Sequence, residues 1–353
     1  MKKVIAVLLL FLLLPVSRAG CAQEYNFGFT DQQTPNRADA FCCSYRLYPE
    51  SPIYDLVICD TAKRRSENSL RENVLSVTLT ARDGSLSQQF EYDSAETPST
   101  VTGGTMAWMD DINFDGYDDL VLCAGRGASN EFSVFCVWNP HENRFDEVMT
   151  EARFDLTSER FGDIVPLELV NYELQPSSKN DEGMVVPPMI ISNENDGCAA
   201  HTRRFYQWEQ GSTGATPHLI AVFDVYETEN DRIGERMYTF ASQGVKLWDT
   251  QYPSQWYYET NAYQDHMDAA DAVVRDSYVA KCVTHSNWVH LREMDSKRSR
   301  SLARLDKGEE VRVLKENCAD GWTLVLWNTW EAQDGGWFGN KMMIGYVWHS
   351  FLQ

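Results

Sequence analysis

The chain has 353 residues, a formal net charge of -21 and nine cysteines. Because most of such an acidic surface repels phosphate, nucleic acid is excluded as a main partner. A chain of this length usually folds as two domains.

The first residues carry the pattern of an export signal. Lys2 and Lys3 precede an apolar stretch from Val4 to Val16, which is too short to span a bilayer stably. We therefore expect a signal peptide over residues 1–20 and a secreted or cell-envelope location.

The end of this segment leaves two alternatives open. Ala19-Gly20-Cys21 is similar to the end of a bacterial lipoprotein signal, but Arg18 stands where an aliphatic residue is expected. If Cys21 is lipidated, the mature protein is tethered to a membrane. If it is not, Cys21 pairs with another cysteine or stays free.

The other cysteines form an even set in a chain that we expect to be exported, which favours disulfides over metal ligands. Cys123 and Cys136 flank a turn-like segment, and Cys282 and Cys318 share the C-terminal region. We expect these two bridges, with Cys59 meeting Cys42 or Cys43, although spacing alone does not fix connectivity. Buried free thiols are the alternative.

Short apolar or alternating runs separated by turn residues recur over residues 22–250 and predict an all-β body. The clearest runs are Tyr54–Cys59, Val74–Thr80, Gln88–Tyr92, Leu120–Cys123, Phe132–Trp138, Met189–Ser192, Phe205–Trp208 and Leu219–Tyr226. Residues 251–280 break this pattern, and Thr260–Val274 has mostly good helix formers, which predicts a partly helical linker. Residues 281–353 then form a second, smaller domain.

The segment Asp110–Asp119 predicts a cation-binding loop. Gly116 occupies the sixth position, where the loop turns sharply, and the carbonyl of Tyr117 supplies the seventh-position ligand. Oxygen-bearing side chains fall at positions one, three, five and nine: Asp111, Asn113, Asp115 and Asp119. These hard ligands suit Ca²⁺.

The loop differs from an EF-hand, because position twelve is Leu122 and a short apolar run follows instead of a helix. A loop that uses its carboxylates as ligands and leads into a core strand is more often structural than catalytic. The alternative is an acidic surface turn without a cation.

The run Asp111-Ile-Asn-Phe-Asp-Gly-Tyr-Asp-Asp-Leu120 resembles the FG-GAP or VCBS-type calcium loop of integrin-like β-propellers. Together with Phe132–Pro140 and Arg144-Phe145, it resembles a family of secreted bacterial proteins with a single such loop, over about Asp55 to Trp248. The resemblance implies a small β-propeller body, and some members of that family inhibit lysozyme-like hydrolases. Integrin propellers repeat the loop blade after blade, whereas this chain has one copy.

The C-terminal stretch resembles a bacterial SH3 domain, which implies a small β-barrel. The resemblance lies in Val289-x-Leu291-Arg292, Ser301–Leu314, Gly321–Val325 and Gly345-Tyr346-Val347. Asp306–Glu309 forms a turn between apolar runs, and the alternation after it is that of a half-buried strand.

Two features of this domain are candidate ligand-binding sites. An insertion from Asn328 to Lys341 carries Trp330, Trp337 and Phe338, which could stack on sugars or grip a peptide, or fold back over the small core. A basic cluster could meet anionic wall polymer or an acidic partner, or be a solvated loop. It comprises Lys297, Arg298 and Arg300.

The sequence favours a binding protein over an enzyme. The histidines are scattered without metal-ligand spacing, and no nucleophile stands with a recognisable base. The leading hypothesis is an exported, Ca²⁺-stabilised envelope protein that recognises peptidoglycan or a protein partner. The alternatives are a periplasmic or extracellular inhibitor of a lysozyme-like hydrolase, and an accessory of a cell-wall hydrolase or an enzyme with an unrecognised site.

Overall fold

The structure is a computed structural model. It describes residues 40–64, 73–98, 105–150, 154–179, 185–195, 200–208, 216–240, 245–275, 279–283, 287–318, 321–333 and 337–353. The predicted signal peptide and Cys21 lie outside these residues.

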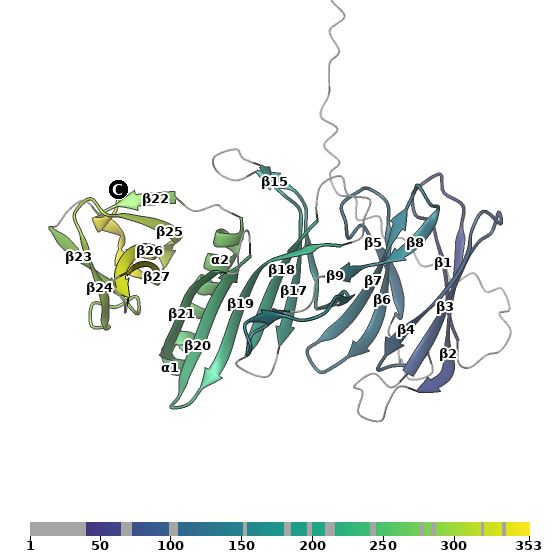
Figure 1. Cartoon of the computed structure of the whole chain (residues 1–353), viewed down its shortest axis with the longest axis horizontal. Coiled ribbons are helices and arrows are strands. Elements are labelled where there is room, and N and C mark those ends of the chain that lie inside the picture. The colour runs from purple at the N-terminus through teal and green to yellow at the C-terminus, as the bar shows by residue number, and fades with distance from the viewer. Residues whose placement is uncertain are drawn as a thin grey trace, which may run out of the picture. The chain divides into compact units, whose positions relative to one another are not determined.

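Three antiparallel sheets follow one another along the first part of the chain (Figure 1). The first sheet contains β1 (Ala40–Tyr45), β2 (Tyr54–Arg64), β3 (Asn73–Ala81) and β4 (Ser87–Ser94), in that order. The second sheet has the order β13-β7-β6-β5, with β8 also paired to β7. Its members are β5 (Ala107–Asp110), β6 (Asp119–Arg126), β7 (Glu131–Asn139), β8 (Arg144–Glu147) and β13 (Glu168–Val170).

The third sheet has the order β14-β17-β18-β19-β20-β21. Its strands are β14 (Glu173–Gln175), β17 (Met189–Asn195), β18 (His201–Gln207), β19 (His218–Thr228), β20 (Arg232–Thr239) and β21 (Val245–Pro253). Short two-stranded pairs are formed by β9 (Met149–Thr150) with β12 (Val165–Pro166), β10 (Phe154–Asp155) with β11 (Arg160–Phe161), and β15 (Ser178–Lys179) with β16 (Val185–Val186).

The second sheet lies between two hydrophobic cores. Successive side chains of a strand point to opposite faces. Leu120 and Leu122 of β6 accordingly pack into the core shared with the first sheet, whereas Val121 between them packs into the core shared with the third sheet. All three side chains are fully buried, which explains why β6 is an uninterrupted apolar run.

The predicted all-β class is confirmed, because sheets dominate the described residues and only two short α-helices accompany them there. Within the described residues, the three sheets of the body pack face to face through these cores and do not close into a propeller ring.

Residues 251–280 contain two helices, α1 (Ser254–Glu259) and α2 (Ala262–Val274). The helix predicted over Thr260–Val274 is therefore present, and α1 was not predicted. Tyr257 of α1 and Ala269 and Ala270 of α2 are buried in one core with side chains of the third sheet and of the C-terminal region. The predicted partly helical linker thus packs against the neighbouring sheets.

The C-terminal sheet has the order β22-β25-β26-β27-β23-β24. Its strands are β22 (Val279–Cys282), β23 (Trp288–Arg292), β24 (Ser301–Asp306), β25 (Glu310–Cys318), β26 (Trp322–Gln333) and β27 (Trp337–Trp348), followed by a 3₁₀ turn at His349–Phe351. It has a small core of its own, which includes Val289, Leu291 and Val325. No closed barrel is present among the described residues.

The described residues of the expected insertion between Asn328 and Lys341 belong to β26 and β27. β26 and β27 pair continuously from Trp322 opposite Trp348 to Gln333 opposite Trp337. Thr329, Trp330, Trp337 and Phe338 are the residues of this segment that favour strands.

A buried hydrogen-bond network joins the third sheet, both helices and the C-terminal sheet. Glu235 of β20 accepts a hydrogen bond from the Tyr257 hydroxyl at 2.9 Å and lies 2.7 Å from Nδ1 of His266 on α2. Nε2 of His266 lies 2.9 Å from the Tyr346 hydroxyl on β27. All four side chains are essentially excluded from solvent.

Replacing His266 tests this network. In the His266→Leu variant, Glu235 loses its contact with the imidazole, and the Tyr346 hydroxyl loses its partner. Because breaking a buried polar pair leaves an uncompensated charge, we expect a loss of about 3–5 kcal/mol in the free energy of unfolding, measured by urea denaturation. Lys63→Ala, which breaks the exposed pair with Glu91, is the control and should cost at most about 1 kcal/mol. Equal effects would contradict the central role of the network.

Candidate functional site

The loop between β5 and β6 adopts the turn that the sequence predicted. Gly116 has a φ of +92°, a value that glycine adopts without strain. The Asp111 carboxylate accepts backbone hydrogen bonds from the N–H groups of Asp115 and Gly116, both at 3.0 Å. Asp115 in turn accepts from the N–H of Tyr117 at 2.9 Å. The acidic side chains therefore hold the loop in its fold.

Asp119 connects the loop to the second sheet. Its two carboxylate oxygens accept hydrogen bonds from the backbone N–H of Ile112 at 3.1 Å and of Trp138 at 2.8 Å. The side chain is fully buried. Because Ile112 lies in the loop and Trp138 lies in β7, a single carboxylate fixes the loop against the neighbouring strand.

The electrostatics of the loop show that its carboxylates are close together. Burial raises the pKa of Asp119 to about 8, and repulsion from Asp115 and Asp111 contributes in the same direction. Burial also raises the pKa of Asp111 to about 6, again with repulsion from Asp115. A cation beside these groups would offset this repulsion.

The types of oxygen atom in the loop suit a calcium ion, since carboxylate, amide and backbone carbonyl oxygens occupy the expected positions in the sequence. Asn113 is already bonded within the loop, its Nδ2 donating to Asp115 at 3.0 Å. Over the described residues, no three His, Cys, Asp or Glu side chains are arranged as a metal-holding group. Binding would thus require a local rearrangement of these side chains, and calcium at Asp111, Asn113, Asp115, Tyr117 and Asp119 remains a prediction.

Tyr172 and Trp108, which the sequence did not predict as part of this site, hold the start of the loop at Asp110. The Tyr172 hydroxyl donates to Asp110 at 3.0 Å and accepts a hydrogen bond from the Trp108 indole N–H at 2.7 Å. The rings of Tyr172 and Trp108 are stacked, with their centres 6.4 Å apart. No sequence pattern relates Tyr172 to a loop so far upstream, so only the fold identifies this contact.

The predicted disulfides are not formed among the described cysteines. Cys123 and Cys136 are buried free thiols, and the register places Cys123 opposite Ser133 and Cys136 opposite Leu120. Cys318 is also a free thiol. The backbone of Cys282 pairs with Glu310, at the opposite end of β25 from Cys318. The pairing register of the strands keeps the two cysteines of each predicted bridge apart. Sequence spacing alone does not give this register.

The third expected pairing is also absent, because Cys42, Cys43 and Cys59 are free thiols. Cys42 lies opposite Val57, whereas Cys59 lies opposite Ala40. Cys42 and Cys59 are therefore diagonal neighbours on one face of the first sheet, and Cys43 points to the other face.

The basic cluster of the C-terminal region is partly engaged. The ammonium group of Lys297 lies 4.9 Å from the centre of the Trp348 ring. The backbone N–H of Arg298 donates to Ser296. Arg300 forms an ion pair with Glu293 at 3.0 Å. The side chains of Trp330, Trp337 and Phe338 lie outside the described residues, so their predicted ligand contacts are untested.

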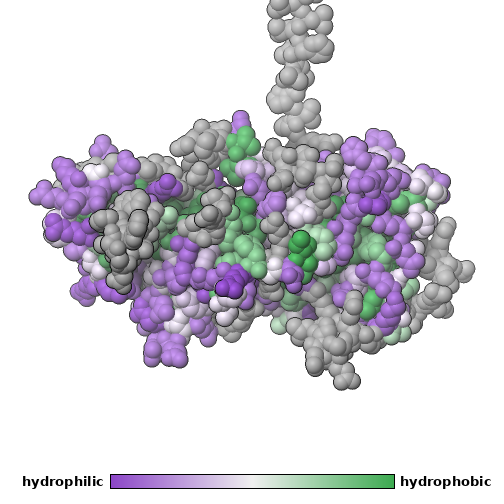
Figure 2. Space-filling model, viewed as in Figure 1, coloured by the Kyte–Doolittle hydropathy of each residue, from purple (hydrophilic) through white to green (hydrophobic). Residues whose placement is uncertain are grey.

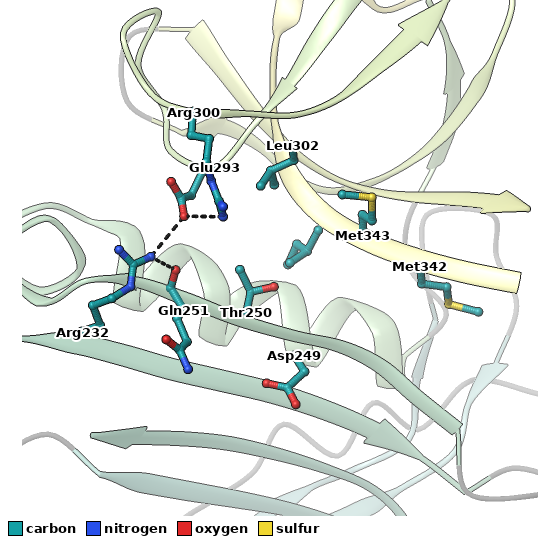
Figure 3. Close-up of a pocket in the computed structure, with 10 residues that line it drawn as sticks. Arg232, Asp249, Thr250, Gln251, Glu293, Arg300, Leu302, Met342 and Met343 are labelled. Carbon is teal, nitrogen blue, oxygen red and sulfur yellow. Dashed lines mark hydrogen bonds and ion pairs between the residues drawn. The ribbon is translucent and has the colours of Figure 1, made fainter. Parts of the chain in front are cut away.

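A cavity of about 540 Å³ lies between the third sheet and the C-terminal sheet (Figure 3). Arg232 of β20 and Arg300 both donate to the same carboxylate oxygen of Glu293, at 3.2 Å and 3.0 Å. The apolar part of the wall comes from Leu302, Met342, Met343 and Ile344, and the rest from Asp249, Thr250 and Gln251. Only Arg300 among these residues was predicted from the sequence as part of a candidate binding site.

Comparison with known proteins gives little further guidance. No family model and no curated protein matches the chain. A solved structure of a Xanthomonas type IV secretion system related protein is similar to this chain with a TM-score of 0.32 and 10% sequence identity. The similarity covers 59% of this chain and 99% of the other. A similarity this low carries no argument about function.

The described helices are too short or too polar to cross a lipid bilayer.

The raised pKa values in the loop predict a pH dependence of stability. In the unfolded chain, an Asp carboxyl titrates near pH 4. Between about pH 4 and pH 8, folded Asp119 retains a proton that the unfolded chain has released, so stability falls as pH rises. With a calcium chelator present, we expect the free energy of unfolding to decrease by a few kcal/mol as the pH rises from about 4 to about 8.

Urea denaturation at a series of pH values measures this effect. Asp119→Asn removes the titrating group but keeps an acceptor oxygen, so it should flatten most of the slope. An unchanged slope in this variant would show that other groups cause the pH dependence.

Proposed function

We propose that this protein is an exported, calcium-stabilised binding protein of the cell envelope, which recognises peptidoglycan or an envelope protein. The observation that carries the proposal is the folded Asp111–Asp119 loop, in which three carboxylates interact around a glycine turn. Carboxylates kept this close are favoured when a divalent cation neutralises them.

The position of the loop supports a stabilising role for calcium. It ends at β6, the strand whose side chains fill the cores on both faces of the second sheet. A cation that orders the loop would therefore fix the start of this central strand, and with it the packing of the three sheets. Nothing in this arrangement requires the cation to contact a substrate.

Binding would use the propeller-like body and the SH3-like C-terminal sheet as separate surfaces. Figure 2 shows a mainly hydrophilic face on which apolar residues are visible in separate patches. The β26–β27 hairpin carries Trp330, Trp337 and Phe338 on its paired strands. Aromatic rings of this kind are suited to sugars and peptides.

Calcium binding is the first test. Extracellular calcium modules bind at about 10⁻⁴ to 10⁻³ M, so a tenfold excess of calcium over Kd should add about 1.4 kcal/mol to the free energy of unfolding. Calorimetric titration and thermal unfolding measure both quantities. Asp115→Ala should abolish binding, because it removes a fifth-position ligand.

Asp118→Ala is the matched control, since Asp118 lies in the same loop at a position that supplies no ligand. It should leave calcium binding nearly unchanged. Absence of binding at millimolar calcium, or equal loss in both variants, would refute the assignment of the loop.

A second candidate function, inhibition of a lysozyme-like hydrolase, is favoured by one surface segment. Residues 157–166 are all exposed, and Phe161, Ile164 and Val165 expose 46%, 69% and 41% of their surface. At the turn before them, Glu159 accepts hydrogen bonds from the Tyr238 hydroxyl and from Lys246, both at 3.0 Å. An apolar segment that is held at one end loses less entropy than a free one when it enters a cleft.

Inhibition is measured as clearance of a cell-wall suspension by a lysozyme-like muramidase mixed with the mature protein at equimolar concentration. If residues 157–166 enter the enzyme, Ile164→Asp should weaken inhibition about tenfold or more, because it places a charge in an apolar contact. Val185→Asp, at an equally exposed apolar position on β16, should have no effect. Absence of inhibition by the unmodified protein would exclude this candidate for that class of enzyme.

A further inference from the structure

The cavity in Figure 3 lies between two strand edges that have no strand partner there. β21 is the last strand of the third sheet, and among the described residues no strand pairs with its outer edge. β27 pairs with β26 on one side, but on the other side it pairs with β23 only where Arg292 meets Tyr346. Met342–Ile344 of β27 therefore face the cavity without a second strand.

Free strand edges carry backbone N–H and C=O groups that pair readily with an added strand. Asp249–Gln251 of β21 line one wall of the cavity, and Met342–Ile344 line the opposite wall. The Gln251 carbonyl already accepts a hydrogen bond from the Arg232 guanidinium, so the other backbone groups of this edge are the ones open to a ligand. The volume of about 540 Å³ is in the range of sites that hold small ligands. An extended peptide end is a ligand that can use backbone pairing and apolar contacts in the same site.

One end of the cavity is positively charged. Arg232 and Arg300 share one carboxylate, that of Glu293, so the two guanidinium groups keep a surplus positive charge. Glu293 is buried, whereas the Arg300 side chain is 66% exposed and can take a further partner. The nearby Asp249 already bonds to the Tyr226 hydroxyl and Lys246. An incoming carboxylate would thus meet two fixed arginines.

The loop that carries Arg300 is built to hold it in place. The backbone N–H of Glu293 donates to the carbonyl of Arg300 at 3.0 Å, which closes the segment between them. The Ser299 hydroxyl donates to the Met294 carbonyl inside this segment, also at 3.0 Å. Fixed donors lose less entropy on binding than free ones.

We infer that this cavity binds the C-terminal end of an extended peptide. The terminal carboxylate pairs with Arg232 and Arg300, the peptide backbone pairs with the free edge of β21, and apolar side chains pack against Leu302, Met343 and Ile344. Figure 3 shows this arrangement of walls, with the arginines at one end and Met342 at the other. The site is separate from the calcium loop and goes beyond the proposed function.

NMR of the full mature protein labelled with ¹³C in its methionine methyl groups tests the inference. The probe is a mixture of random tetrapeptides with free C-terminal carboxylates, and Met342→Leu and Met343→Leu assign the two cavity signals. We expect saturable shifts of these signals at millimolar peptide. If neither signal moves, the cavity does not bind peptide ends and the inference is wrong.

Chemical variants of the peptide probe test carboxylate recognition and strand pairing separately. The C-terminal amide of the same mixture should bind about tenfold or more weakly, because hydrogen bonds to a charged group are stronger than those to a neutral one. Peptides N-methylated at alternate residues should weaken by a similar factor, because they lose donors for the strand edge. Equal binding of the amide would refute carboxylate recognition, and equal binding of the N-methylated set would refute strand pairing.

Matched arginine variants locate the site. Arg300→Gln should weaken binding of the free-carboxylate peptides about tenfold or more and reduce the difference between acid and amide. Arg304→Gln is the control, because Arg304 lies on β24 with its guanidinium 4.6 Å from the Trp288 ring centre and does not line the cavity. Equal effects of the two variants would place the peptide elsewhere.

Discussion

The buried carboxylate of Glu235 is the constraint on which the C-terminal half of the structure depends. A carboxylate removed from water is costly unless hydrogen bonds replace its hydration. Glu235 finds those partners on α1 and α2, and His266 extends the connection to Tyr346 of β27. The third sheet, the helices and the C-terminal sheet therefore need one another, because each supplies a group that would otherwise be buried without a partner.

This network also determines the geometry of the cavity. β21 is next to β20 in the third sheet, and Tyr346 lies in β27 directly after the cavity residues Met342–Ile344. Fixing Tyr346 against the helices thus sets the separation of the two strand edges. Outside the network, the indole of Trp256 donates to Asp295 at 2.9 Å, which ties α1 to the loop that carries Arg300. The gap between the edges is consequently a defined space.

The turn of the Asp110–Asp119 loop was predictable from the sequence because the pattern that specifies it is local. Each oxygen-bearing side chain, and the glycine at the turn, occupies a position counted along a few consecutive residues, and the structure places Gly116 at the positive φ that this spacing requires. The all-β class and the helix before Val274 were predictable for the same reason, since strand and helix periodicities extend over short windows.

Other features depend on contacts between distant segments and were missed or mispredicted. Cys123 and Cys136 flank a turn, but strand register offsets them, and register depends on the packing of whole faces. No role could be predicted from the sequence for His266 among the scattered histidines, because its partners Glu235 and Tyr346 are remote in sequence. The sequence did not relate the two cavity arginines to each other, since Arg232 lies on β20 and Arg300 lies far along the chain in the loop between β23 and β24.

The shared core has a consequence for how the chain is made. Ribosomes deliver residues in order, so the third sheet emerges long before Trp322 and Tyr346, which complete its hydrophobic core. Until then, Trp248 and Tyr252 lack part of their packing. The nascent chain therefore passes through a period in which it needs protection from association, and its final folding step waits for the last residues to be synthesised.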